Sequence, residues 1–345
     1  MKIKLLFALP ILSLALLMSS CDNTLDINAP WKDITVTYGL LNQTDSVHYV
    51  KVGKAFLGEE NAYMLAQEFD SLYYGDNIEV TLKELATGTI YTMERVLDNS
   101  KPDGVFHSPA QILYKKAFTV NPNSRYELRI LKGNDLEHVV AQTVIVDDFV
   151  IDNPKQNSKV SLTSPTFPYK VQFKSAKDGT LYQMTIRINY MELNKFNPAD
   201  STLKYLDWVF QERTSRNDEG GESMNYDLVY PGIYTFMASR IPVDENVTRH
   251  LRGLDFFFSV AAEEFQIYQE VNRPSSSIVQ ERPLYTNIEN GLGLFSARYN
   301  KNLYDIDVTD FTIDSIACGQ YTRGLNFGYY RALPASNQID TLYCN

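Results

Sequence analysis

Histidine, cysteine and tryptophan are scarce in this chain, with four, three and two residues respectively among 345. The histidines do not cluster with the cysteines, so no metal site built from these two residue types is expected. The sequence also lacks a glycine-rich phosphate loop, an HExxH motif and a Gly-x-Ser-x-Gly motif. These absences favour a protein that is not an enzyme and that needs no cofactor. The histidines are His48, His107, His138 and His250.

Facing carboxylates of the kind that glycosidases use are also not evident. Acidic pairs occur at Glu59-Glu60, Asp147-Asp148 and Glu263-Glu264, and each pair is adjacent in sequence. Neighbouring residues of a strand or helix point in different directions, whereas glycoside hydrolysis needs two carboxyl groups facing across a cleft. These acids are therefore interpreted as solvated.

Positive charge is in deficit. The chain carries 32 Lys and Arg against 42 Asp and Glu, a formal net charge of −10. Removal of residues 1–20, which hold two lysines and no acid, would bring this charge to −12. An acidic body argues against binding to nucleic acid and against electrostatic attraction to anionic lipids.

Long apolar runs are absent except at the start. Lys2 and Lys4 precede the apolar stretch Leu5–Met18, whose 14 residues suit a signal peptide and are too few for an ordinary membrane-spanning helix. Small serines at 19–20 then precede Cys21. This arrangement resembles the lipobox of bacterial lipoproteins, and it predicts that Cys21 carries lipid. The alternative is an ordinary secretory signal with an incidental cysteine.

The lipobox resemblance has one departure, because Met18 stands where Val, Ala or Thr is more usual. It implies that residues 1–20 are a signal peptide and that residues 21–30 tether the protein to a membrane through acyl chains on Cys21. The expected location is the cell envelope, at the outer membrane. Which of its two faces, periplasmic or surface, stays open.

The pattern of residues 31–150 predicts a mainly β fold, with an N-terminal antiparallel β-sandwich. Apolar and polar residues alternate over Ile34–Tyr38, Ile78–Leu82 and Tyr126–Ile130, and Val139–Val146 is a further apolar strand candidate. Turn residues separate these segments, as expected for a sandwich. One helix is expected over 61–72, from apolar residues at helical spacing.

A polar segment with a proline, residues 152–158, is the expected domain boundary. Residues 159–345 are expected to form a second β-rich domain with one or two short helices. Residues 169–175 and 181–190 flank Lys177-Asp178-Gly179, which predicts a hairpin. Residues 203–212 and 226–236 are expected to continue that sheet. A helix capped by Ser259 is expected to reach about Gln269.

Two cysteines remain besides Cys21, and both lie near the end of the chain. Exported proteins meet an oxidising compartment, so we expect a disulfide between Cys318 and Cys344, with two free thiols as the alternative. The acidic loop 217–222 offers oxygen ligands for calcium, but it lacks the spacing of a known loop. It is interpreted as a solvated hairpin tip, and cation binding there stays open.

A short pattern, Asp followed by Ser or Thr and then an apolar residue or Thr, occurs five times. It resembles the O-glycosylation sequon of exported Bacteroidota proteins, and ordinary residue frequencies give roughly one such match in a chain of this length. The alternative is that these dipeptides mark turns. The candidate acceptors are Ser46, Ser71, Ser201, Ser315 and Thr341.

The segment Glu281–Phe295, ERPLYTNIENGLGLF, resembles the C-terminal signature of a large family of Bacteroidota envelope lipoproteins of unknown function. Arg282 intervenes before the proline, and Thr286 replaces the family's serine. The preceding segment 261–268 is also similar to the family. The two glycines, Gly291 and Gly293, are interpreted as structural, because glycine allows close approach of the backbone.

This resemblance implies an immunoglobulin-like or transthyretin-like N-terminal sandwich. It also implies association with TonB-dependent outer-membrane receptors, and hence a binding or accessory role in uptake. A structural adhesin or fimbrial-type subunit is the alternative, since such subunits are also lipoproteins with two sandwich domains. An enzyme is the least favoured class. Fold alone does not decide among these functions.

Overall fold

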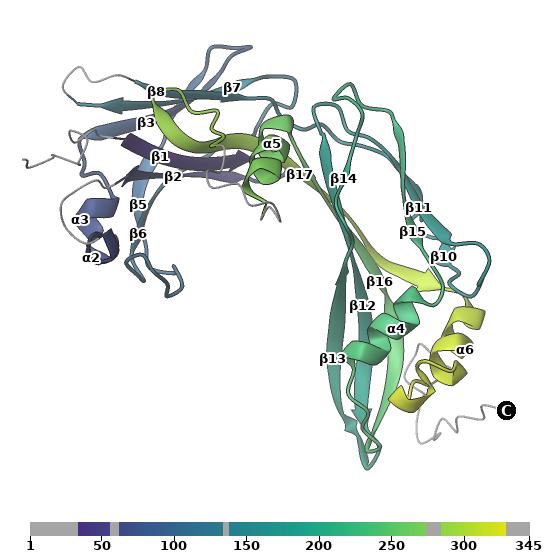
Figure 1. Ribbon diagram of the computed structural model, residues 1–345. Coiled ribbons are helices and arrows are strands. Elements are labelled where there is room, and N and C mark those ends of the chain that lie inside the picture. Colours follow the sequence, from purple (N-terminus) through teal and green to yellow (C-terminus); the bar gives the residue numbers. More distant parts are fainter. Residues whose placement is uncertain (1–33, 56–61, 134–137, 274–283, 329–345) are drawn as a thin grey trace, which may run out of the picture.

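The computed structural model describes residues 34–55, 62–133, 138–273 and 284–328. It confirms a mainly β protein with a few short helices. The described strands form three sheets, and Figure 1 shows them gathered into two lobes joined by the long strand β17 (Gly291–Val308). Because the first thirty-three residues lie outside this description, the signal peptide, Cys21 and the tether stay sequence-based predictions.

The first lobe contains two layers of strands. One layer follows the order β17-β1-β2-β6-β5 and the other β4-β3-β7-β8. The first comprises β1 (Ile34–Leu41), β2 (Val47–Ala55), β6 (Gln111–Ala117) and β5 (Glu94–Asp98). The second comprises β4 (Ile90–Thr92), β3 (Ile78–Glu84), β7 (Tyr126–Lys132) and β8 (Val139–Thr143). Alternate side chains of the inner strands of both layers are buried in one core, whereas the edge strands β4 and β5 have no buried side chain.

The helix expected over 61–72 is interrupted. Residue 61 lies outside the described residues, and two short helices follow, α2 (Ala62–Gln67) and α3 (Phe69–Leu72). Glu68 between them is extended, with φ −91° and ψ 118°. The break lets Phe69 pack on Tyr73, with ring centroids 4.9 Å apart, and Leu72 is buried. Apolar spacing predicted helical structure here but not the break.

The second lobe contains the rest of the long sheet and a small sheet beside it. The long sheet continues through β16 (Val247–Ala261), β12 (Leu181–Asn194) and β13 (Asn197–Val209). The small sheet has β15 (Ser223–Leu228), β11 (Tyr169–Lys174) and β9 (Ile151–Asn153). Two short strands are β10 (Lys159–Val160) and β14 (Arg213–Thr214). The helices are α4 (Gly232–Arg240), α5 (Glu263–Asn272) and α6 (Asp310–Cys318), with the 3-10 turn η1 (Arg323–Leu325).

The predicted hairpin at 177–179 is wrong, because β11 and β12 belong to different sheets. The chain turns a corner there around the buried ring of Tyr182. The Tyr182 hydroxyl donates to the carbonyl of Gly179 at 2.9 Å and accepts from the amide of Ala176 at 2.7 Å. This buried side chain binds both ends of the turn and separates the two strands, which local turn residues could not reveal.

The strand expected over 226–236 is also wrong in its second half. β15 ends at Leu228, and α4 begins just after Pro231. Proline cannot donate a hydrogen bond to a sheet ladder, but it suits the start of a helix. The apolar residues that followed the proline, Ile233 and Tyr234 among them, are buried on the helix instead.

The helix expected from Ser259 begins later. Residues through Ala261 remain in β16, paired with both β12 and β17, and the N-cap of α5 is Ala262. The Ser259 hydroxyl donates to Asn300 Oδ1 at 2.9 Å instead of capping the helix. Sheet pairing on both sides of β16 therefore overrode the local capping signal.

A buried arginine fixes the end of the second lobe. Arg249 of β16 is 1% exposed. Its Nε donates to Glu192 Oε2 at 2.9 Å, while its two Nη atoms donate to the carbonyls of Leu325 (2.6 Å) and Pro242 (3.1 Å). All three nitrogens are thereby satisfied, as a buried guanidinium requires.

Strand β17 belongs to both lobes. Its first part pairs in parallel with β1, from Thr35–Gly291 to Leu41–Ala297. Its next part pairs antiparallel with β16, from Ala261–Arg298 to Leu254–Ile306. The sequence assigned residues 291–297 to the second region, whereas this pairing places them in a sheet of the first lobe. The segment that resembles a family signature therefore connects the two lobes.

Candidate binding site

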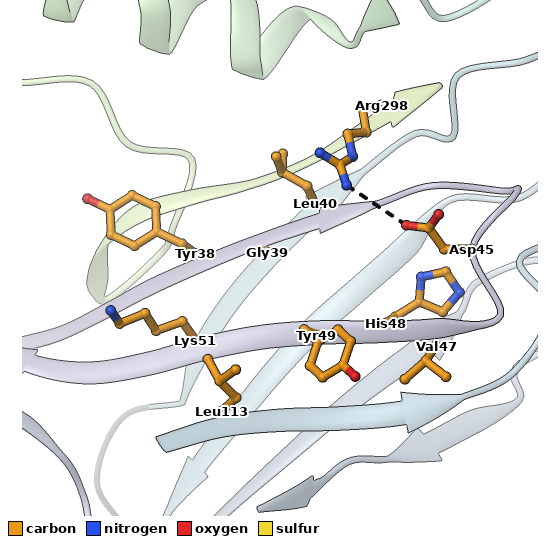
Figure 2. Close-up of a pocket in the computed structure, with 10 residues that line it drawn as sticks. All are labelled: Tyr38, Gly39, Leu40, Asp45, Val47, His48, Tyr49, Lys51, Leu113 and Arg298. Carbon is orange, nitrogen blue, oxygen red and sulfur yellow. Dashed lines mark ion pairs between the residues drawn. The ribbon is translucent and has the colours of Figure 1, made fainter. Parts of the chain in front are cut away.

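The outer face of the first-lobe sheet carries an open, hollowed surface. Side chains of β1 and β2 that point away from the core include Tyr38, Tyr49 and Lys51, and both tyrosine rings are exposed. They border a hollow of about 300 Å³, shown in Figure 2. Its lining consists of Tyr38, Gly39, Leu40, Asp45, Val47, His48, Tyr49, Lys51, Leu113 and Arg298.

A second hollow, of about 350 Å³, adjoins the first across Tyr49. Both hollows share Val47 and Tyr49, so they form one continuous surface, which we call the open face. Residues that line the second hollow are Val47, Tyr49, Glu94, Lys115, Lys116 and Ala117. The ring of Tyr49 therefore stands in the middle of a surface that spans β2, β6 and their neighbours.

One wall of the open face is a pair of tyrosines. The hydroxyls of Tyr38 and Tyr268 lie 3.4 Å apart, and their rings meet edge to face with centroids 6.3 Å apart. Tyr268 is on α5, which packs against β17. Burial, together with the neighbouring Tyr268 hydroxyl, raises the pKa of Tyr38 to about 12. The Tyr38 hydroxyl therefore stays protonated at neutral pH and can donate to a ligand.

The lysines that line the open face form no ion pair in the described part of the chain. Lys51 lies opposite Tyr38 in the β1–β2 pairing, and its side chain is half-buried. Burial lowers the pKa of Lys51. Among the described residues, no carboxylate forms an ion pair with Lys51, Lys115 or Lys116. The half-buried Lys51 ammonium, with no carboxylate in contact, favours an incoming anion. Lys115 points to the same face but has Glu94 directly opposite it in the β5–β6 pairing, and Lys116, opposite the buried His48, points to the other face.

The far end of the first hollow holds a weak ion pair. Arg298 Nη2 of β17 lies 4.0 Å from Asp45 Oδ2 in the turn before β2, the dashed line of Figure 2. Both side chains are exposed, so this pair contributes little stability and the guanidinium can turn to another acceptor. The neighbouring His48 is buried, and burial lowers its pKa.

A half-buried acid, Glu264, holds α5 against the first lobe. Glu264 Oε2 accepts hydrogen bonds from Ser296 Oγ of β17 at 3.2 Å and from Thr143 Oγ1 of β8 at 3.4 Å. Burial raises the pKa of Glu264. Its neighbour Glu263 is exposed, so the two carboxylates of this pair point apart, as the sequence predicted. The interpretation of both acids as solvated is wrong for Glu264, because the fold of α5 onto β8 and β17 covers its carboxylate.

The glycines of the signature segment meet β1 closely. Gly293 has a φ of +116°, and a Cβ atom on Gly291 would lie 2.9 Å from the Thr35 carbonyl oxygen. Both glycines therefore permit the parallel pairing with β1, which agrees with their structural interpretation. They lie on the strand that carries Arg298, so they also position one side of the open face.

The candidate glycosylation residues lie in different surroundings. Ser46 sits in the turn before β2 and Ser201 in β13, and both are exposed. Ser71 and Ser315 lie within α3 and α6 and are half-buried. Thr341 lies outside the described residues. Modification of these residues stays a prediction.

The remaining predicted sites also stay open. Cys318 ends α6, while its expected partner Cys344 lies outside the described residues. The acidic loop 217–222 packs beside the corner at Lys177, where the amide of Asp178 donates to the Asp218 carbonyl oxygen at 2.7 Å. The described ranges contain no group of three or more His, Cys, Asp or Glu that could hold a metal ion.

Sequence reasoning did not single out Tyr38, Tyr49, Lys51 or Lys115. The alternation of residues 34–38 pointed the other way, because it groups Tyr38 with the apolar Ile34 and Val36, whereas the structure buries Thr35 and Thr37 and exposes Tyr38. The assembly of the site from β1, β2, β6 and β17 could not be read from one segment. No family model matches the chain, and no curated protein matches it either. The family resemblance therefore rests on residues 261–268 and 281–295 of this sequence.

Proposed function

We propose that this protein is a lipid-anchored binding protein of the cell envelope, and that its open face takes an anionic ligand bearing a flat apolar ring. The observation that carries the ligand class is that two lysines without an ion pair among the described residues, Lys51 and Lys115, lie beside exposed tyrosine rings on one face, in a chain with net charge −10. Opposite charge supplies a charge-assisted hydrogen bond, and the tyrosine rings supply apolar area.

Lipid anchoring is supported by the sequence around Cys21. In the described parts of the chain, no helix has the length and apolar character needed to cross a membrane. The test is metabolic labelling with a radioactive fatty acid. Label should enter the wild-type protein and be lost in Cys21→Ala, and equal labelling of the two would contradict the anchor.

The resemblance of residues 281–295 supports an accessory role, in which the protein associates with a TonB-dependent outer-membrane receptor. Tagged, lipidated protein should be recovered from its own envelope with one such receptor at near-equal amount, identified by mass spectrometry. Recovery of the protein alone would contradict the accessory role. SDS-resistant ladders of the protein itself would favour the alternative, a fimbrial-type subunit.

Ligand class is tested with a matched pair of probes, naphthalene-2-sulfonate and the uncharged 2-naphthalenemethanol. Ligand-detected NMR should show binding of the sulfonate and not of the alcohol, with weaker binding at high salt. Lys51→Met should weaken sulfonate binding by roughly tenfold, the effect of losing one charge-assisted hydrogen bond.

The control is Lys83→Met on β3, because Lys83 also has no ion pair among the described residues but lies outside the open face. This variant should bind the sulfonate like the wild type. Equal binding of both probes, or equal loss in both lysine variants, would overturn the proposed ligand class.

A further inference from the structure

Strand β13 ends the long sheet with an uncovered edge. It pairs with β12 on one side, over residues 201–209, and in the described part of the chain no strand pairs with its other side. In Figure 1 it lies at the margin of the second lobe. Such an edge presents a row of free amide and carbonyl groups, a template for another strand.

The hydrogen-bond alternation shows which groups are free. The amide of Phe210 donates to the carbonyl of Met184 at 2.9 Å, continuing the β12–β13 ladder by one pair. In an antiparallel ladder only every second residue bonds to the neighbouring strand. Residues 204, 206 and 208 therefore bond to β12, and residues 203, 205, 207 and 209 direct their amides and carbonyls to the open edge.

The usual protections of an edge are missing here. Edges are commonly guarded by prolines, free lysines or bulges. Residues 201–209 contain no proline, and their pairing with β12 has no register shift. Lys204 is bonded to Glu192, and Asp207 is bonded to Arg187 at 2.7 Å. Both charges of this segment are thus already neutralised.

The side chains beside the edge are apolar and exposed. Leu203, Tyr205 and Val209 are 61%, 56% and 55% exposed, and all three point to the same face as Asp207. Arg187 covers one side of the Tyr205 ring, with its guanidinium carbon 4.0 Å from the ring centroid. An edge with exposed apolar side chains and no unpaired charge favours a partner strand that is also apolar and uncharged.

We propose that β13 pairs antiparallel with β13 of a second copy of this chain, about a two-fold axis at Leu206. This register matches the free groups, because it joins odd-numbered residues to odd-numbered residues. Leu203 then lies opposite Val209 of the second copy, and Tyr205 lies opposite Asp207 of the second copy. The apolar side chains of Leu203 and Val209 thus contact each other, and the hydroxyl of Tyr205 reaches the Asp207 carboxylate.

Neighbouring registers are less favourable. An axis at Tyr205 places Leu203 opposite the Asp207 carboxylate of the second copy. An axis at Asp207 places two carboxylates directly opposite each other, which destabilises a sheet. The axis at Leu206 is therefore the register that the side chains select. This interface is independent of the open face, which lies on the first lobe.

The test is disulfide crosslinking of the full chain in its native envelope. Two differently tagged copies, one Leu203→Cys and the other Val209→Cys, are expressed together. Opposed residues of an antiparallel pair lie about 5.5 Å apart at Cα, within the range of a disulfide. The mixed crosslinked dimer should exceed the crosslink of either variant expressed alone by roughly tenfold, since equivalent residues of the two copies are six positions out of register.

Absence of the mixed crosslink, in variants that keep the wild-type thermal melting, would overturn the proposal. Equal crosslinking by each variant alone would overturn the register and the two-fold pairing. A second measurement compares the oligomeric state of double variants that place like or opposite charges at the paired positions 203 and 209. Leu203→Glu with Val209→Glu should give monomers by light scattering, whereas Leu203→Lys with Val209→Glu should keep the dimer. The same oligomeric state in both double variants would contradict the proposal.

Discussion

Gly293 lies opposite Thr37 where β17 pairs with β1, and a Cβ atom on Gly293 would lie 1.9 Å from the Thr37 carbonyl oxygen. No side chain fits at that distance. With its φ of +116°, Gly293 also adopts a backbone conformation that other residues rarely take. A glycine at position 293 is therefore required for β17 to pair with β1.

Substitution of either signature glycine should lower stability. Gly293→Val should reduce the free energy of unfolding by more than about 3 kcal/mol, because β17 must move away from β1. Gly291→Val should act in the same direction, with the Thr35 carbonyl as the obstacle. Thermal unfolding measures both effects.

A matched control is Gly104→Ala, since a Cβ atom there meets nothing within 4 Å. Its free energy of unfolding should stay within about 0.5 kcal/mol of the wild type. Unchanged melting of the signature variants, with loss of ligand binding, would reverse the structural interpretation of these glycines.

Arg249→Met should destabilise the second lobe by about 3–5 kcal/mol. The substitution leaves the buried carbonyl of Leu325 and the partly covered carbonyl of Pro242 without their donor and removes one partner of Glu192. Denaturant unfolding tests this value. Arg129→Met removes the ion pair of an exposed guanidinium with the largely covered carboxylate of Glu127, and it should cost about 1 kcal/mol. If both variants lost a similar free energy of unfolding, the burial of Arg249 would not explain its contribution to stability.

Glu264 should make stability fall as pH rises. Its folded pKa is raised above the ordinary value of 4.5 by burial, so the folded protein holds a proton that the unfolded chain releases. The stabilisation is complete below pH 4.5 and is lost as pH rises through the folded pKa. Glu264→Gln cannot ionise, so its stability relative to the wild type should increase from pH 4.5 to pH 7. A constant difference across that range would contradict this assignment.

Glycosylation should appear as excess mass. Intact-mass measurement of the exported protein should exceed the mass of the lipidated polypeptide, with sugar first on the exposed Ser46 and Ser201. Ser71 and Ser315 are half-buried within helices and should be modified less. Replacing Ser46 and Ser201 with alanine should remove most of the excess. A mass equal to the lipidated polypeptide would remove the hypothesis.

Much of the β architecture was predictable because alternation of apolar and polar residues marks strands. It did not always mark the buried face, since Thr35 and Thr37 are buried and Tyr38 is exposed. The segments 34–38, 78–82 and 126–130 all lie within strands. The predicted element boundaries were wrong where contacts with residues distant in sequence determine the local structure. The corner before β12 depends on the buried ring of Tyr182, and the late start of α5 depends on pairing with strands on both sides. Neither contact is local in sequence.

The candidate site was less accessible to sequence reasoning. Lys51, Lys115 and Arg298 come from three strands that are far apart in the chain, and only their sheet order brings them to one face. That order includes the parallel pairing of β1 with β17, which alternation cannot reveal. The lysines are candidates for ligand binding because they form no ion pair among the described residues. That property belongs to the folded surface and no sequence motif reports it.

The parallel pairing of β1 with β17 has a mechanical consequence. Tension between the chain before Ile34 and the second lobe would pull these two strands in opposite directions along their shared axis. The seven residue pairs of that ladder would then bear the load together, in shear, instead of opening one after another. A protein held at its N-terminus and pulled through its second lobe should therefore resist force at this ladder, and its junction should yield abruptly.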